Sequence, residues 1–134
     1  MSAGLEVEVV GARAVAGALD AEEIERLCAL ALASAGIADG HVAVAFVAPG
    51  RIRELNREHR DRDAVTDVLS FPVDGGEPAA GPRELGDVVI CPEETADLRE
   101  AVVHGALHLA GMDHEADDGE MLALQRELLS WTLP

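Results

Sequence analysis

The segment from residue 104 to residue 114, His-Gly-Ala-Leu-His-Leu-Ala-Gly-Met-Asp-His, constrains the fold of this chain more than any other stretch. His104 and His108 are four residues apart, so on a helix they share one face, one turn apart. Gly111 can adopt a positive φ and end that helix at its C′ position. The chain can then turn back and bring His114 toward the other two imidazoles. Three converging imidazoles predict a three-ligand Zn²⁺ site, one ion per chain, with the open fourth position of a catalytic metal.

Hydrophobic periodicity along the rest of the chain predicts an α+β fold. Apolar alternation is typical of half-buried strands, and a cap followed by apolar residues at helical spacing is typical of helices. We expect strands at residues 5–10, 41–48, 66–73 and 85–91, and helices at residues 21–35, 49–59, 93–110 and 117–131. This order, βαβαββαα, predicts a single layer of four-stranded mixed sheet covered by helices, with a zincin-like metal helix. Residues 74–83 are rich in Gly, Pro and Ala without a period, so we expect an exposed hairpin loop there. No linker divides the sequence, so we expect residues 1–134 to form a single domain.

The charge of the chain is strongly negative but unevenly distributed. The formal net charge is −16, from 26 acidic against 10 basic residues, which opposes long-range attraction to nucleic acid. The chain has no lysine, and five of its ten arginines fall within twelve residues: Arg51, Arg53, Arg57, Arg60 and Arg62. Acidic residues interleave with them, so one interpretation is a solvated helix face with local ion pairs. The other is a local anion site, because arginine is well shaped for phosphate.

The cysteines and the chain ends favour a cytoplasmic protein. Cys28 and Cys91 lie far apart in apolar surroundings, so we expect two buried free thiols in a reducing compartment. A disulfide or a thiolate ligand is the less favoured alternative. We find no secretory signal at the N-terminus and no apolar stretch long enough to span a membrane.

The histidine spacing also matches the metzincin pattern His-Glu-x-x-His-x-x-Gly-x-x-His, except at the glutamate. Gly105 stands where that glutamate, the general base of the peptidase, would be. A peptidase interpretation therefore lacks its mechanism. Three neutral imidazoles would leave the full charge on a zinc ion, which lowers the pKa of a bound water to about 7 and suits phosphodiester substrates near an arginine. Asp113 and Glu115 could orient an imidazole N–H or could be exposed turn acids.

Three motifs together resemble the YbeY family of bacterial rRNA maturation endoribonucleases. The first is the histidine segment, residues 104–115. The second is Leu-Asn-x-x-x-Arg at residues 55–60, followed by Thr-Asp-Val-Leu-Ser-Phe-Pro at residues 66–72. The third is Leu-Gly-Asp-Val-Val-Ile at residues 85–90. They occur in the family's order and cover most of the chain from Leu55 onward.

The resemblance implies a metal-dependent hydrolase that cleaves single-stranded RNA in ribosome biogenesis, chiefly in late small-subunit (16S) rRNA 3′-end processing. It implies zinc held by His104, His108 and His114, and a catalytic role for Arg60 in holding phosphate. The chain departs from the family between Asp87 and His104, where the connection is shorter. Cys91-Pro-Glu-Glu is expected to run straight into the histidine helix, which would leave one side of the cleft more open.

Other functions remain open from the sequence. A non-catalytic, zinc-stabilised ribosome-assembly factor would bind a ribosomal protein or pre-rRNA, and the −16 charge favours basic partners. The expected partners are single-stranded RNA or pre-rRNA, with ribosomal proteins or an assembly GTPase as further candidates, and neither membrane nor DNA. Imidazole ligands also suit Ni, Cu and Fe. The sequence does not identify the general base, the oligomeric state or the RNA cleavage site.

Overall fold

The computed structural model describes residues 4–15, 17–73 and 84–131. The predicted hairpin loop at residues 74–83 lies outside the described residues. The elements follow in the order β1 (Leu5–Val10), the 3₁₀ turn η1 (Ala12–Val15), α1 (Ala21–Ser34), β2 (Gly40–Phe46), α2 (Pro49–Arg60), β3 (Val68–Pro72), β4 (Glu84–Ile90), the 3₁₀ turn η2 (Pro92–Glu94), α3 (Leu98–Leu109) and α4 (Glu120–Trp131). No helix in these ranges is long and apolar enough to cross a membrane.

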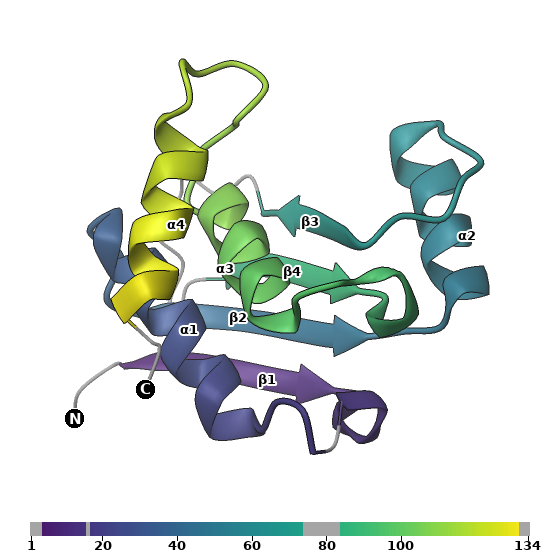
Figure 1. Ribbon diagram of the computed structural model, residues 1–134, viewed down its shortest axis with the longest axis horizontal. Helices are drawn as coiled ribbons and strands as arrows, with labels where there is room; N and C mark the ends of the chain where they lie inside the picture. Colours follow the sequence, from purple (N-terminus) through teal and green to yellow (C-terminus); the bar gives the residue numbers. More distant parts are fainter. Residues whose placement is uncertain (1–3, 16, 74–83, 132–134) are drawn as a thin grey trace.

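The described strands form one four-stranded mixed sheet in the order β1-β2-β4-β3 (Figure 1). β1 pairs parallel with β2, and β2 pairs parallel with β4. β3 pairs antiparallel with β4 and forms one edge of the sheet. The predicted mixed sheet covered by helices is therefore confirmed.

The helices cover both faces of the sheet unequally. Figure 1 shows α1, α3 and α4 together in front of the strands, and their buried side chains join those of β2 and β4 in the main core. Successive strand residues point to opposite faces, so Val88 faces the main core while Val89 faces the other side. There Val89 and Leu69 pack with Ile52 of α2 in a second, smaller cluster. α2 thus lies across the sheet from α3, and its last residue, Arg60, ends near the edge strand.

The predicted bounds of the histidine helix were wrong at its start. Pro92 opens the short turn η2, and Thr95 closes it by donating its hydroxyl to the carbonyl of Cys91. α3 begins only at Leu98, where Asp97 caps the helix by accepting the backbone N–H groups of the next two residues. The connection from β4 to α3 is therefore a distinct turn and not a helix continuing from Cys91.

The last helix also begins later than predicted, at Glu120 instead of Asp117. Asp117 accepts the N–H groups of Gly119 and Met121, so it caps the helix from outside. The strand predicted from Thr66 starts at Val68. These differences arise because caps and turns, and not the apolar pattern, set element ends.

The two cysteines are buried and unpaired, as predicted. Cys28 lies in the main core, and Cys91 lies in the cluster beneath α2. Burial raises the pKa of the Cys28 thiol to about 12, so this thiol is inert at neutral pH.

Candidate metal centre

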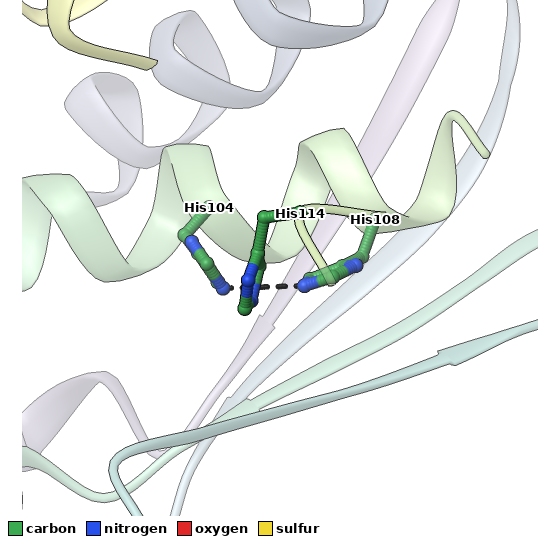
Figure 2. Close-up of side chains that lie close together, drawn as sticks. All are labelled: His104, His108 and His114. Carbon is green, nitrogen blue, oxygen red and sulfur yellow. Dashed lines mark hydrogen bonds between the residues drawn. The ribbon is translucent and has the colours of Figure 1, made fainter. Parts of the chain in front are cut away.

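α3 and the turn after it bring three imidazoles together. His104 and His108 lie one turn apart on α3, and Gly111 follows the helix at φ +98°. The chain then turns back, with the N–H of Met112 donating to the carbonyl of Leu107, and delivers His114. Figure 2 shows the three rings converging, with ring centroids 4.7, 5.0 and 5.3 Å apart. The rings lie together as the spacing predicts, while metal binding by them stays a prediction.

Hydrogen bonds that Nδ1 donates orient two of the rings. His104 Nδ1 lies 2.8 Å from Oε1 of Gln125, and His108 Nδ1 lies 2.9 Å from the backbone carbonyl of Met112. Both partners are acceptors, so in each neutral ring Nδ1 carries the proton and Nε2 carries a lone pair. The two Nε2 atoms nevertheless lie 3.2 Å apart, joined by the dashed line in Figure 2. A proton or a cation between these two atoms would remove the repulsion of facing lone pairs.

The geometry fits a metal ion. One ligand atom from each of the three histidines lies within 4.8 Å of the other two. Zn–N bonds of about 2.1 Å in tetrahedral geometry place neighbouring nitrogens about 3.4 Å apart, close to the observed Nε2 pair. Burial, and then the neighbouring His104, lower the pKa of His108, which favours the neutral imidazole that a metal binds. These three histidines could therefore hold a metal ion.

The residue that orients His104 was missed by the sequence analysis. Asp113 and Glu115, the carboxylates considered for that role, are exposed, and Asp113 accepts the backbone N–H of Glu115. Gln125 is only 6% exposed, between the buried Met121 and Leu128 of α4. A polar side chain on the inward face of an amphipathic helix was the available signal.

Gly105 faces the sheet closely. A Cβ atom at this position would lie 2.4 Å from Cγ1 of Val88, which is fully buried. The carbonyl of Gly105 also accepts a hydrogen bond of 3.0 Å from the hydroxyl of Ser70. A glutamate side chain does not fit here without moving β4. Packing against β4 thus explains why position 105 holds glycine and not the glutamate that a peptidase would need.

The histidines lie along a cleft of about 750 Å³ between β3, the segment 95–97 before α3, α3 itself and α4. Its acidic lining residues are Asp67, Asp97, Glu100, Asp113 and Glu115, and Arg60 is the one arginine among the described lining residues. Arg60 donates from Nη2 to the backbone carbonyl of Ser70, 2.8 Å away. The local ion-pair interpretation holds for three other arginines: Arg51 pairs with Glu54, and Arg53 and Arg57 pair with Asp63.

The model of the family described as Endoribonuclease YbeY matches residues 13–132. The chain belongs to the YbeY family. Among its relatives, an Endoribonuclease YbeY from Rubrobacter xylanophilus is 41% identical over 131 residues, covering 92% of this chain and 93% of that protein. Another from Macrococcus caseolyticus is 36% identical over 145 residues, covering 94% of each. A solution structure of a Thermotoga maritima protein is similar at a TM-score of 0.55 and 29% identity, covering 92% of this chain and 87% of that one.

Two of the YbeY motifs line this cleft, through Arg60, the strand β3 and the histidine segment, and the third, in β4, pairs with β3. Asn56 is buried and donates from its side chain to the carbonyl of Ala64, which fixes the loop after α2. Gly86 lies at φ +134°, and a Cβ atom there would lie 2.4 Å from the carbonyl oxygen of Phe71. Glycine at this position therefore lets β3 approach β4. In this YbeY-family chain, the motifs that contain Asn56 and Gly86 thus position the edge strand β3. The histidine helix, which carries the remaining motif, packs against that strand.

Proposed function

We propose that this chain is a single-domain, zinc-dependent endoribonuclease that cleaves single-stranded RNA. Its role would be rRNA maturation in the cytoplasm, in late processing of the 3′ end of 16S rRNA. The observation that carries the proposal is the cluster of three imidazoles in a cleft that Arg60 also lines. The names of the relatives, Endoribonuclease YbeY, agree with it.

The roles of the residues follow from their positions. His104, His108 and His114 would hold one zinc ion through one nitrogen each, in a zincin-like arrangement of a His-x-x-x-His helix and a following turn. When bound, zinc would supply a Lewis acid and lower the pKa of a coordinated water. Gln125 and the Met112 carbonyl, by accepting from Nδ1, would keep Nε2 of His104 and of His108 free to bind the metal. Arg60 uses one N–H on Ser70, which leaves others to bind a phosphate oxygen of the RNA.

Metal analysis and RNA cleavage by the purified protein test the proposal. We expect about one zinc per chain and cleavage of unstructured RNA in preference to duplex RNA. His114→Ala should lose both the metal and the activity, because it removes one of the three ligands. Arg60→Ala should keep its metal and lose about 100-fold in activity, as the loss of one donor to a reacting anion typically costs.

Arg53→Ala is the matched control for Arg60→Ala. Arg53 lies on the same helix but pairs with Asp63 through two hydrogen bonds outside the cleft lining. The Arg53→Ala protein should cleave RNA like the wild type. Cleavage unchanged in His114→Ala would refute the metal-dependent nuclease, and full activity of Arg60→Ala would remove Arg60 from the mechanism.

The acidic lining of the cleft favours a second candidate, a non-catalytic assembly factor. Five carboxylates in the cleft and a net charge of −16 would attract basic ribosomal proteins, and an assembly GTPase is a further candidate partner. In that case zinc would stabilise the turn before α4. The fourth coordination position separates the two candidates: water or phosphate there favours catalysis, and a fourth protein ligand such as Asp113 favours a structural metal.

A further inference from the structure

Ser70 contacts two functional parts of the cleft at once. It lies in the edge strand β3, and it is only 5% exposed. Its side-chain hydroxyl donates to the carbonyl of Gly105 on α3, 3.0 Å away. Its own backbone carbonyl accepts the hydrogen bond from Nη2 of Arg60, 2.8 Å away. One buried residue thus connects the end of α2 with the histidine helix.

The packing around Ser70 makes this connection short and stiff. Gly105 directly follows His104, and a Cβ atom there would lie 3.3 Å from the Ser70 hydroxyl. The absence of a side chain at Gly105 is what brings the helix backbone within reach of β3. β3 is held on its other side by its pairing with β4, where Ser70 lies opposite the buried Val88. Neither Ser70 nor Gly105, the two ends of this hydrogen bond, can shift without moving a packed strand or helix.

We propose that Ser70 is a positioning residue that sets the distance between the Arg60 guanidinium and the imidazole cluster. This inference rests on the proposed function, because it assigns those two groups to one phosphodiester. A phosphate bound at the cluster must present a second oxygen to Arg60 at the same time. Reaction rates fall steeply with misplacement, about 100-fold for 1 Å. A hydroxyl that couples β3 to α3 therefore controls catalysis without touching the RNA.

Ser70→Ala is the informative substitution, since it removes the hydroxyl but keeps the carbonyl that holds Arg60. It leaves no buried acceptor unpaired, because the carbonyl of Gly105 keeps its place in the helical hydrogen-bond ladder. We expect kcat on single-stranded RNA to fall about 10-fold or more, while zinc affinity stays within about threefold because the three histidines are untouched. Ser70→Thr retains the hydroxyl and should restore most of kcat.

Coupling to Arg60 separates positioning from a general packing role. If Ser70 acts through Arg60, the effect of Arg60→Ala should shrink from about 100-fold to under about 10-fold in a Ser70→Ala background. Ser34→Ala is the matched control, because its hydroxyl donates to the carbonyl of Ala31 on α1, outside the cleft. Wild-type kcat in Ser70→Ala, or fully additive effects of the two substitutions, would overturn the inference.

Binding of inorganic phosphate to the zinc-loaded protein gives a readout independent of RNA cleavage. Titration calorimetry should show weaker phosphate binding in Ser70→Ala and in Arg60→Ala than in the wild type and Ser34→Ala. If the wild type does not cleave RNA, the proposed nuclease fails, but weaker phosphate binding in Ser70→Ala still supports the positioning role. Phosphate binding equal to that of the wild type overturns that role, whatever the activity.

Discussion

Gln125 of α4 accepts a hydrogen bond from His104 of α3 across the interface of the two helices, at a distance of 2.8 Å. This contact fixes the ring so that Nε2 faces the other histidines. Such partners typically contribute a factor of about 10 to 100 to metal affinity. The contact also makes α4, which provides none of the three histidines, part of the candidate metal centre.

Gln125→Leu should therefore bind zinc about 10- to 100-fold more weakly than the wild type. Leucine keeps the buried volume but offers no acceptor to His104 Nδ1. Competition with a chromophoric chelator measures the affinity. Arg126→Leu, at an exposed position next to Gln125 on the same helix, is the control and should bind zinc like the wild type. Equal zinc affinity in both variants would show that Gln125 does not orient His104.

Gly105→Ala should destabilise the fold by about 1 to 3 kcal/mol, the usual cost of overpacking a core. Helix propensity alone would favour alanine by about 1 kcal/mol, but the added Cβ would lie 2.4 Å from Cγ1 of Val88. Urea unfolding measures the change. Gly50→Ala is the control, because Gly50 lies in α2 with no atom within 4 Å of an added Cβ. It should be neutral or slightly stabilising.

A second substitution identifies the cause of that loss. Val88→Ala removes the two γ carbons that the new Cβ would meet. The Gly105→Ala, Val88→Ala double variant should therefore be more stable than the sum of the single effects predicts. Additive effects would mean that the clash with Val88 is relieved elsewhere.

His41 should make the stability of the protein depend on pH. Its Nδ1 lies 3.0 Å from Oε2 of Glu84 and its Nε2 lies 3.3 Å from Oε1 of Glu8, on adjacent strands. The hydrogen bond to Glu84 is the main cause that raises the pKa of His41 above its ordinary value of 6.5. Because the folded pKa is higher than the unfolded one, the stabilisation is fully present below about pH 6.5 and is lost as pH rises through the folded pKa.

Urea unfolding of the wild type and His41→Gln at about pH 5.5 and 8.5 tests this, on either side of the ordinary histidine pKa. The difference in free energy of unfolding between the wild type and His41→Gln should be larger at the lower pH, in favour of the wild type. In a Glu84→Gln background the difference between the two pH values should shrink, because the main partner is gone. A larger advantage at the higher pH would contradict the sign of the shift.

RNA binding should depend weakly on salt. Arg60 is the one arginine among the described residues that line the cleft, and a single contact to a single-stranded phosphate gives a slope of about −0.7 in log K against log salt. Raising salt fourfold then weakens binding about threefold at most, and screening of the −16 charge offsets part of that loss. Fluorescence anisotropy with a single-stranded oligonucleotide measures the slope. A loss of more than about 10-fold would require several further phosphate contacts.

The sequence by itself determined the parts of this protein that depend on local spacing. A four-residue interval places His104 and His108 on one face of a helix, and a glycine that accepts positive φ returns the chain to His114. Within the described residues, the apolar periods likewise predicted each strand and each long helix, because burial on one face repeats along the chain. The starts of α3 and α4 escaped this reasoning, because the side chains of Asp97 and Asp117 set them.

Only the tertiary structure decided which residues surround the histidines. Arg60 lines the cleft because β3 lies at the sheet edge between α2 and α3, whereas Arg53 on the same helix pairs with Asp63. Gln125 is far from His104 in sequence and meets it because α4 packs on α3. Such contacts join segments whose separation carries no periodic signal. They follow from the order of the strands and the packing of the core, which local pattern does not encode.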